Sequence, residues 1–261
     1  MANYEPSKPT QAVTSRHVDA LARTVLTSLR SYPSTEMRSR LSQAAHDLAS
    51  LTVMPGEFDT DAVMDDLRQR RLSHADLMDF CIPEAAFLIG QGWTDDRLPF
   101  WQVSLAGARL YQLAKRISTE WNGASGYDAR MAVLLVMCEE STHVLGPALL
   151  ADQLRRAGCS VSSVTAGRDT QLAQVINQSA FDLVIFTCSS LDVLETVAHL
   201  VQQTREETCL VPPMVLGGPV MDYAENIREV TGVDLVTKDI KKALSLCARP
   251  MTDHMELKVA E

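Results

Sequence analysis

Residues 131–146 read MAVLLVMCEESTHVLG, in which an apolar strand from Met131 to Met137 gives way to the start of a helix. The strand is apolar at every position, which is typical of a parallel sheet that is buried on both faces. Open α/β sheets bind ligands in the crevice at the carboxyl ends of their strands. We therefore expect His143 to stand in a ligand-binding crevice.

The chain beyond residue 128 alternates between apolar runs and helical patterns, which predicts β-α units. Continuous apolar strands imply an α/β fold, with a doubly wound, Rossmann-like parallel sheet of five strands covered by helices on both faces. The predicted strands are Arg130–Cys138, Ser160–Thr165, Phe181–Thr187, Met214–Leu216 and Asp234–Thr237. The predicted helices are Val144–Ala157, Thr170–Gln178, Leu191–Arg205, Met221–Val230 and Ile240–Cys247.

The chain before residue 121 carries only helical signals, which predict an N-terminal helical bundle. Asp59 or Thr60, and then Ser73, are predicted N-caps, and Pro83 is expected to kink the helix that Ser73 begins. The other helices are predicted at His17–Leu29, Glu36–Leu51, Asp61–Arg70 and Leu98–Ile117. The expected divisions are a disordered arm (1–15), the bundle (16–120), a linker (121–128), the sheet domain (129–250) and a tail (251–261).

The composition excludes several classes of protein. The 261 residues are 46% hydrophobic, enough for one or two cores, and the formal net charge is −9. No basic stripe stands out, so we expect no direct binding to DNA. No apolar run approaches the roughly 20 residues that span a bilayer, and no secretory leader is visible, so we expect a cytoplasmic protein without membrane contact. The chain shows no nucleophile elbow, P-loop or G-x-G-x-x-G, so we expect a non-enzyme.

Three short motifs follow three predicted strand ends. They are Ser141-Thr142-His143-Val144-Leu145-Gly146, Thr187-Cys188-Ser189-Ser190-Leu191 and Val215-Leu216-Gly217-Gly218-Pro219. The order His-x-x-Gly, Ser-x-Leu, Gly-Gly resembles the cobalamin-binding domain, in which the histidine replaces the lower base as axial ligand to cobalt. The resemblance implies that residues 129–250 bind cobalamin and that His143 is the metal ligand. The cofactor-binding residues that it implies are Ser141, Thr142, His143, Val144, Leu145, Gly146, Thr187, Ser189, Leu191, Val215, Gly217 and Gly218.

The same resemblance gives some of these residues a role toward the released base and its tail. Gly146 would let the tail pass close to the helix, and Ser189 would offer its hydroxyl to a nitrogen of the base. Gly217 and Gly218 would leave room for the flat base. Each motif also has a purely structural interpretation, as a helix start, a serine N-cap or a strand-to-helix turn. Ser141 stands where the family usually has an aspartate, so we expect weak lower-face ligation.

The helical half resembles two groups of cobalamin proteins. In photoreceptors of the CarH and LitR type, a tryptophan and, nine residues later, a Glu-His pair cover the upper face of the corrin. Trp93 fits this pattern, but Val103-Ser104 replaces Glu-His, so control from the upper face must differ. Trp93 and Val103 complete the candidate cofactor-binding residues. The segments Ile82–Ala86, Gly90–Asp96 and Val103–Leu110 resemble the AerR/PpaA antirepressors of purple photosynthetic bacteria, a resemblance that spans about residues 75–247.

The AerR/PpaA resemblance implies a cobalamin-binding, light-responsive regulator that acts on a CrtJ/PpsR-type repressor of photosystem genes through protein contact. The acidic charge also suits a protein partner better than DNA. Two alternatives stay open: a corrinoid carrier for methyl transfer, and a haem sensor on the same scaffold, because histidine also ligates haem iron. The resemblance does not determine whether the cobalamin is the hydroxo-, methyl- or adenosyl- form. The physiological input and a homo-oligomeric state also stay open.

Overall fold

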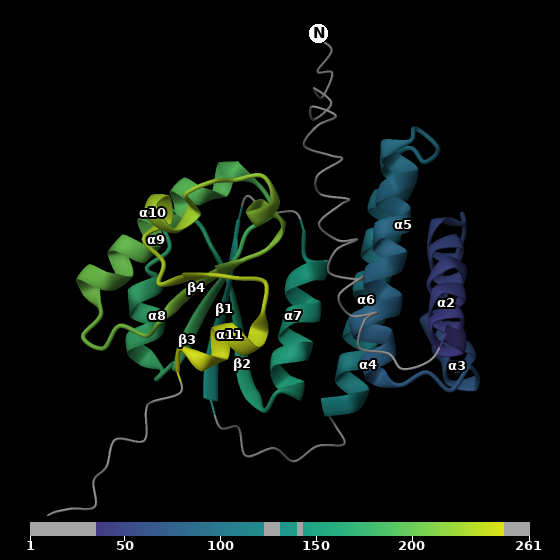
Figure 1. Cartoon of the computed structure of the whole chain (residues 1–261), viewed down its shortest axis with the longest axis horizontal. Helices are drawn as coiled ribbons and strands as arrows, with labels where there is room; N and C mark the ends of the chain where they lie inside the picture. The colour runs from purple at the N-terminus through teal and green to yellow at the C-terminus, as the bar shows by residue number, and fades with distance from the viewer. Residues whose placement is uncertain (1–34, 123–130, 140–142, 248–261) are drawn as a thin grey trace, which may run out of the picture.

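The computed structural model describes residues 35–122, 131–139 and 143–247, which form a helical bundle and an α/β sheet domain (Figure 1). The predicted arm, the predicted helix His17–Leu29 and the predicted tail lie outside the described residues. Within the described ranges, no helix combines the length and the apolar character of a membrane span. The bundle consists of α2 (Thr35–Val53), α3 (Thr60–Gln69), α4 (His74–Asp76), α5 (Ile82–Thr94) and α6 (Phe100–Asn122).

Two predicted N-caps in the bundle are confirmed. The Oδ1 atom of Asp59 accepts hydrogen bonds from the backbone N–H groups of Asp61 and Ala62, both at 3.0 Å. Ser73 and Asp76 form a capping box, in which each side chain accepts a hydrogen bond from the other residue's backbone N–H. Both caps satisfy amide groups that the first turn of a helix leaves without intrahelical partners.

The helix that Ser73 begins is interrupted before Pro83. A π-helical turn at Leu77–Cys81 separates α4 from α5. Pro83 falls in the first turn of α5, where its missing N–H costs little. The irregularity therefore precedes Pro83, which corrects the prediction of a proline kink. The cause is the extra residue that a π-turn inserts into a helix.

Arg109 on α6 is a buried cation, with only 6% of its surface exposed. Its Nη1 atom donates to the carbonyl oxygens of Thr52, at 2.9 Å, and Met54, at 2.6 Å. Its Nη2 atom donates to the carbonyl oxygen of Gly56. The last carbonyl groups of a helix have no intrahelical donors. Arg109 supplies donors to carbonyl groups at and just after the end of α2.

We expect the substitution Arg109→Met to lower the free energy of unfolding by about 3 kcal/mol, because the carbonyl group of the buried Thr52 and those of Met54 and Gly56 lose a charged donor. Urea denaturation followed by circular dichroism measures the change. Lys115→Met, at an exposed position on the same helix, is the matched control and should stay within about 0.5 kcal/mol of the wild type. Equal stability of the two variants would contradict the role of Arg109.

The sheet domain confirms the predicted α/β fold, with five parallel strands in the order β2-β1-β3-β4-β5. Helices cover both faces of the sheet (Figure 1): one buried cluster joins it to α8 and α9, the other to α7 and α11. The strands are β1 (Met131–Cys138), β2 (Cys159–Ala166), β3 (Leu183–Thr187), β4 (Met214–Gly217) and β5 (Leu235–Val236). The helices are α7 (Leu145–Arg156), α8 (Leu172–Gln178), α9 (Leu194–Glu207), α10 (Ile227–Thr231) and α11 (Ile240–Ser245).

Several predicted boundaries differ from the structure by a few residues, and two differences are larger. The predicted helix Met221–Val230 is instead a 3-10 turn, Pro219–Asp222, followed by the short helix α10. Asn226 lies between them with a left-handed φ of 55°, which a continuous right-handed helix does not allow. Helix α6 continues to Asn122, inside the predicted linker, and residues 123–128 of that linker lie outside the described residues.

Candidate functional site

The strand order creates a topological switch point between β1 and β3. These strands are neighbours, and their register pairs Met137 with Thr187 near both carboxyl ends. The chain leaves β1 for α7 on one face of the sheet and leaves β3 for α9 on the other. Open α/β sheets bind their ligands at such a point. The motifs around His143 and Ser189 therefore follow the two strands that flank it.

His143 lies directly before α7, and its side chain is exposed. Val144, the N-cap of α7, is 44% exposed and makes no side-chain cap. Leu145 packs against the bundle core, whereas Gly146 is exposed and a Cβ added there would meet no atom within 4 Å. An imidazole nitrogen at this position is suited to a transition metal. Of the predicted site residues, Ser141 and Thr142 lie outside the described ranges.

The end of β3 presents a buried serine. The Thr187 hydroxyl donates to the carbonyl oxygen of Val136 at 3.3 Å, which ties the ends of β3 and β1 together. Ser189 is 7% exposed, and Leu191, which begins a 3-10 turn, is 51% exposed. Ser190 is the residue before that turn and makes no side-chain cap. The N-cap interpretation of the serine pair therefore does not apply to Ser190.

The end of β4 lies tightly against its neighbours. Val215 is 1% exposed and belongs to the core between the sheet, α7 and α11. A Cβ at Gly217 would lie 2.9 Å from the carbonyl oxygen of Thr237. Gly218 has a φ of +117°, and its Cβ would lie 2.2 Å from the carbonyl oxygen of Cys188. The approach of the β3 end therefore requires glycine at 218, and the Cys188 backbone fills the space that the missing side chain leaves.

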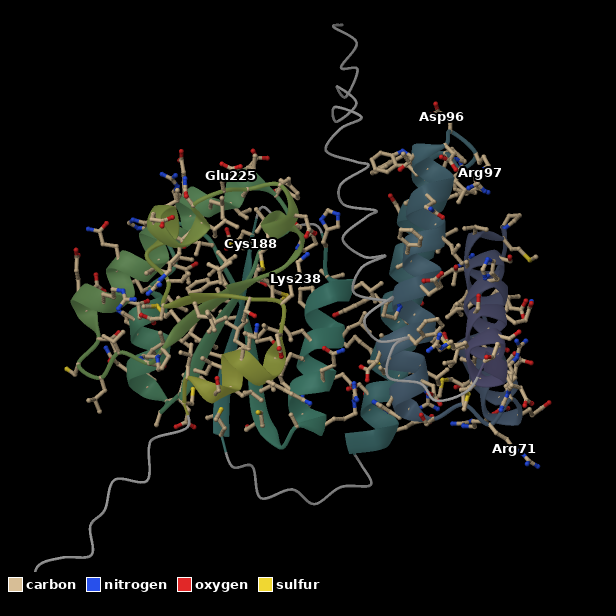
Figure 2. The ribbon with its side chains drawn as sticks, in the orientation of Figure 1. Arg71, Asp96, Arg97, Cys188, Glu225 and Lys238 are labelled. Atoms are coloured by element: carbon tan, nitrogen blue, oxygen red, sulfur yellow. The ribbon has the colours of Figure 1, made fainter. Side chains whose placement is uncertain are left out.

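Sequence analysis missed two further residues at this edge, Tyr223 and Lys238. The Tyr223 hydroxyl donates to the carbonyl oxygen of Ser189. Burial raises the pKa of Tyr223, which keeps this donor protonated. Lys238 Nζ lies 2.6 Å from both carboxylate oxygens of Asp222. Tyr223 follows β4 and Lys238 follows β5, and the shared edge of parallel strands was the signal that could have found them. Figure 2 labels Lys238 together with Cys188, the residue that follows β3.

The candidate residues of the bundle lie around the turn between α5 and α6. Trp93 is half-buried, and its ring packs against Phe100 with 6.3 Å between the ring centroids. Val103 is half-buried and packs against the bundle core. Phe100 and Trp101, which sequence analysis missed, are 70% and 58% exposed. Asp96 marks this turn at one end of the bundle in Figure 2. The turn therefore presents aromatic surface to its surroundings.

Helix α7 joins the candidate site to the bundle, and Figure 1 shows it between the sheet and α6. Leu145 and Leu149 pack against the bundle core. Asp152 is 1% exposed and lies 2.8 Å from both His74 Nε2 and Arg156 Nε. Helix α7, which begins beside His143, therefore contacts the bundle through apolar packing in its first half and through a hydrogen bond between Asp152 and His74 farther along.

Asp79, on the π-turn of the bundle, completes this set of contacts. Its carboxylate accepts hydrogen bonds from Gln153 Nε2 at 2.9 Å and from two guanidinium nitrogens of Arg156 at 3.0 and 2.5 Å. Burial opposes the charge of Asp152, but the hydrogen bonds from His74 and Arg156 outweigh it and lower the pKa of Asp152. We name these five side chains, His74, Asp79, Asp152, Gln153 and Arg156, the α7 clasp.

This chain is similar in sequence and in structure to known proteins. The chain is similar to an uncharacterized 20.5 kDa protein in the bchF–crtJ intergenic region of Rhodobacter capsulatus, with 32% identity over 186 residues that cover 71% of this chain and 97% of that protein. It is also similar to the solved structure of the Methanosarcina barkeri monomethylamine corrinoid protein, with a TM-score of 0.61, 11% identity and coverage of 80% of this chain and 97% of that one. No family model matches the chain. The structural similarity shows a shared fold.

Proposed function

Because this chain belongs to the family of the 20.5 kDa protein in the bchF–crtJ intergenic region of Rhodobacter capsulatus, we propose that it is a cobalamin-binding, light-responsive antirepressor. The observation that carries the proposal is an exposed histidine, His143, at the switch point of an open α/β sheet. The fold that this chain shares with a corrinoid protein supports the same assignment.

The residues at the strand ends suit a corrinoid. The exposed imidazole of His143 offers a nitrogen donor of the kind that cobalt accepts, and it precedes a helix whose first turn has an exposed glycine, Gly146. His143 would be the lower axial ligand, and Ser189 would donate to a nitrogen of the displaced base. Bound cobalamin supplies visible absorption and a light-sensitive axial bond. The chain itself orients the ligand and transmits its presence to the bundle.

Helix α7 is the route by which binding would reach the bundle. His143 directly precedes α7, and the α7 clasp joins the same helix to α4 and the π-turn. A ligand that draws His143 toward cobalt would favour one position of α7 and so one arrangement of the bundle. Such a population shift requires different affinities of the ligand for the two arrangements.

A repressor of the CrtJ/PpsR type is the partner that we propose. The relative lies beside crtJ, and genes of one regulatory circuit are often neighbours. The formal net charge of −9 favours a protein partner over DNA. The bundle, with its exposed Phe100 and Trp101, is the surface that we expect to bind the partner.

The test is a titration with hydroxocobalamin followed by ultraviolet–visible spectroscopy, in the dark and after illumination. We expect a protein-bound corrin spectrum that changes with light, and light-dependent release of a CrtJ/PpsR-type repressor from DNA in a mobility-shift assay. A protein that binds no hydroxocobalamin would overturn the cobalamin assignment. A Soret band after parallel reconstitution with haem, without corrin binding, would point to a haem sensor instead.

A corrinoid carrier for methyl transfer is the second candidate. The similarity to the Methanosarcina barkeri corrinoid protein favours it, since the TM-score is 0.61 over 80% of this chain. In this case the cofactor carries the chemistry, and the protein orients it for a separate methyltransferase. Methyl transfer from a methylamine-specific methyltransferase to the protein loaded with cob(I)alamin would favour the carrier. Light-dependent repressor binding without methyl transfer would favour the regulator.

The substitution Gly146→Ala is expected to have opposite effects on stability and on binding. Alanine is a better helix former and meets no atom within 4 Å, so the free energy of unfolding should rise by about 0.5 kcal/mol. Cobalamin should bind about tenfold more weakly, because a methyl group intrudes where the tail would pass.

Gly107→Ala on α6 is the matched control, since a Cβ there also meets no atom within 4 Å. It should stabilise the fold and leave the dissociation constant of cobalamin unchanged. Isothermal titration calorimetry and urea denaturation measure both quantities. Unchanged cobalamin binding by Gly146→Ala would contradict the path of the tail along α7.

A further inference from the structure

The loop that follows β4 is fastened across the end of β3. We name residues 218–224 the β4 loop. The backbone N–H of Cys188 donates to the carbonyl oxygen of Gly217 at 2.9 Å, and that of Val220 donates to the carbonyl oxygen of Cys188 at 3.3 Å. The hydroxyl of Tyr223 donates to the carbonyl oxygen of Ser189. Three hydrogen bonds therefore join the end of β4 and the β4 loop to two consecutive residues of the neighbouring strand end.

The two segments fit closely at Gly218. The Cβ of any other residue there would lie 2.2 Å from the carbonyl oxygen of Cys188. The Tyr223 ring is half-buried and packs against the core of that face of the sheet. The resemblance implies that Ser189 and Gly218 contact the base of the ligand. These two residues belong to the end of β3 and the β4 loop, which are in direct contact. A flat base can lie between these segments only after they separate.

The β4 loop is built for such a movement. It contains one short 3-10 turn, Pro219–Asp222, and the left-handed Asn226 stands between it and α10. Short 3-10 turns and irregular segments open at a lower free-energy cost than long helices. The loop remains anchored by Val220, which is fully buried, and by the ion pair between Asp222 and Lys238. Tyr223 lies near the end of the loop, and its hydroxyl donates a hydrogen bond to the carbonyl oxygen of Ser189, just after β3.

We infer that Tyr223 is a latch that the nucleotide tail of a corrinoid must release before the base enters between Ser189 and Gly218. The latch selects the class of ligand: it opposes corrinoids that carry a nucleotide tail and leaves tail-less corrinoids unaffected. This inference rests on the proposed function. It assigns a positioning role to Tyr223, which acts through the loop.

The experiment compares hydroxocobalamin with hydroxocobinamide, which lacks the nucleotide tail, on the full chain. Tyr223→Phe keeps the ring and removes the hydroxyl that donates to the carbonyl oxygen of Ser189. We expect the variant to bind hydroxocobalamin about fivefold faster in stopped-flow absorbance, because one hydrogen bond no longer has to break. Hydroxocobinamide should bind both proteins at the same rate. In the protein without ligand, the amide of Val220 should exchange its hydrogen about fivefold faster.

Tyr111→Phe, on α6 of the bundle, is the matched control and should change neither rate. Equal acceleration of both corrinoids, or no acceleration of either, in a protein whose wild type binds both would overturn the latch and leave the proposed function standing. A wild type that binds neither corrinoid would overturn the proposed function and the latch with it. Melting temperatures of the two variants show whether both are folded.

Discussion

Replacing His143 with alanine is expected to abolish the protein-bound corrin spectrum. The imidazole would be the lower axial ligand, and no neighbouring side chain in the motif replaces its nitrogen. Loss of hydrogen-bonding partners behind a metal ligand already costs about 10–100-fold in affinity, so loss of the ligand itself should cost at least about 100-fold. The measurement is absorbance of hydroxocobalamin that co-elutes with protein in gel filtration. Because His143 is exposed, the free energy of unfolding should change by less than about 0.5 kcal/mol.

The matched control is His46→Ala, at an exposed histidine on α2 whose Nδ1 atom lies 2.8 Å from the carbonyl oxygen of Ser42 on the same helix. This variant should bind cobalamin like the wild type. Free imidazole added to His143→Ala should restore part of the bound spectrum, because it supplies the missing nitrogen. Full retention of the spectrum by His143→Ala would exclude His143 as the axial ligand.

Replacing Asp152 with alanine is expected to cost about 3–5 kcal/mol of unfolding free energy, the range for removing one partner of a buried ion pair. Asp152 is 1% exposed and contacts His74 and Arg156 at 2.8 Å each. Its loss leaves His74 and Arg156 without this carboxylate, so the bundle and the sheet domain should also separate more readily. Urea denaturation measures the first effect, and limited proteolysis of the segment between α6 and β1 measures the second.

Asp65→Ala tests the same change at the surface. Asp65 pairs with Arg68 at 2.6 Å, but the two side chains are 68% and 54% exposed, so the loss should stay below about 1 kcal/mol. The Asp152 effect should also depend on pH. Its folded pKa lies below the ordinary 3.8, so its contribution is present above pH 3.8 and is lost as the pH falls through the folded value. A stability difference between wild type and Asp152→Ala that does not shrink as the pH is lowered below 3.8 would contradict this explanation.

Local signals in the sequence predicted the elements well. The N-caps Asp59 and Ser73 were predicted because a short polar side chain before a helical pattern satisfies free amide groups. The parallel sheet was predicted because its central strands are continuously apolar, and β1 was placed within one residue of its observed start at Met131. The part of the candidate site that lies at strand ends was also predicted, because the carboxyl ends of parallel strands meet at one edge of the sheet.

Contacts between distant segments were not predicted. Arg109 reaches carbonyl groups more than 50 residues away in the chain, and Arg156 reaches Asp79 over 77 residues. Neither pairing has a periodic signature, because charged residues on helices are usually solvated. The same holds for Tyr223, which was predicted to lie in the helix Met221–Val230 and whose hydroxyl in the structure donates to the carbonyl oxygen of Ser189.

The hydrophobic pattern and capping residues of this chain were therefore enough to predict a helical bundle, a parallel sheet and a histidine after the carboxyl end of a strand. These features depend on interactions between residues a few positions apart, or on the period of a single element. The α7 clasp, the buried Arg109 and the closed β4 loop depend on how finished elements pack. Gly218 illustrates the difference: the sequence predicted space beside it, and packing filled that space with the carbonyl group of Cys188.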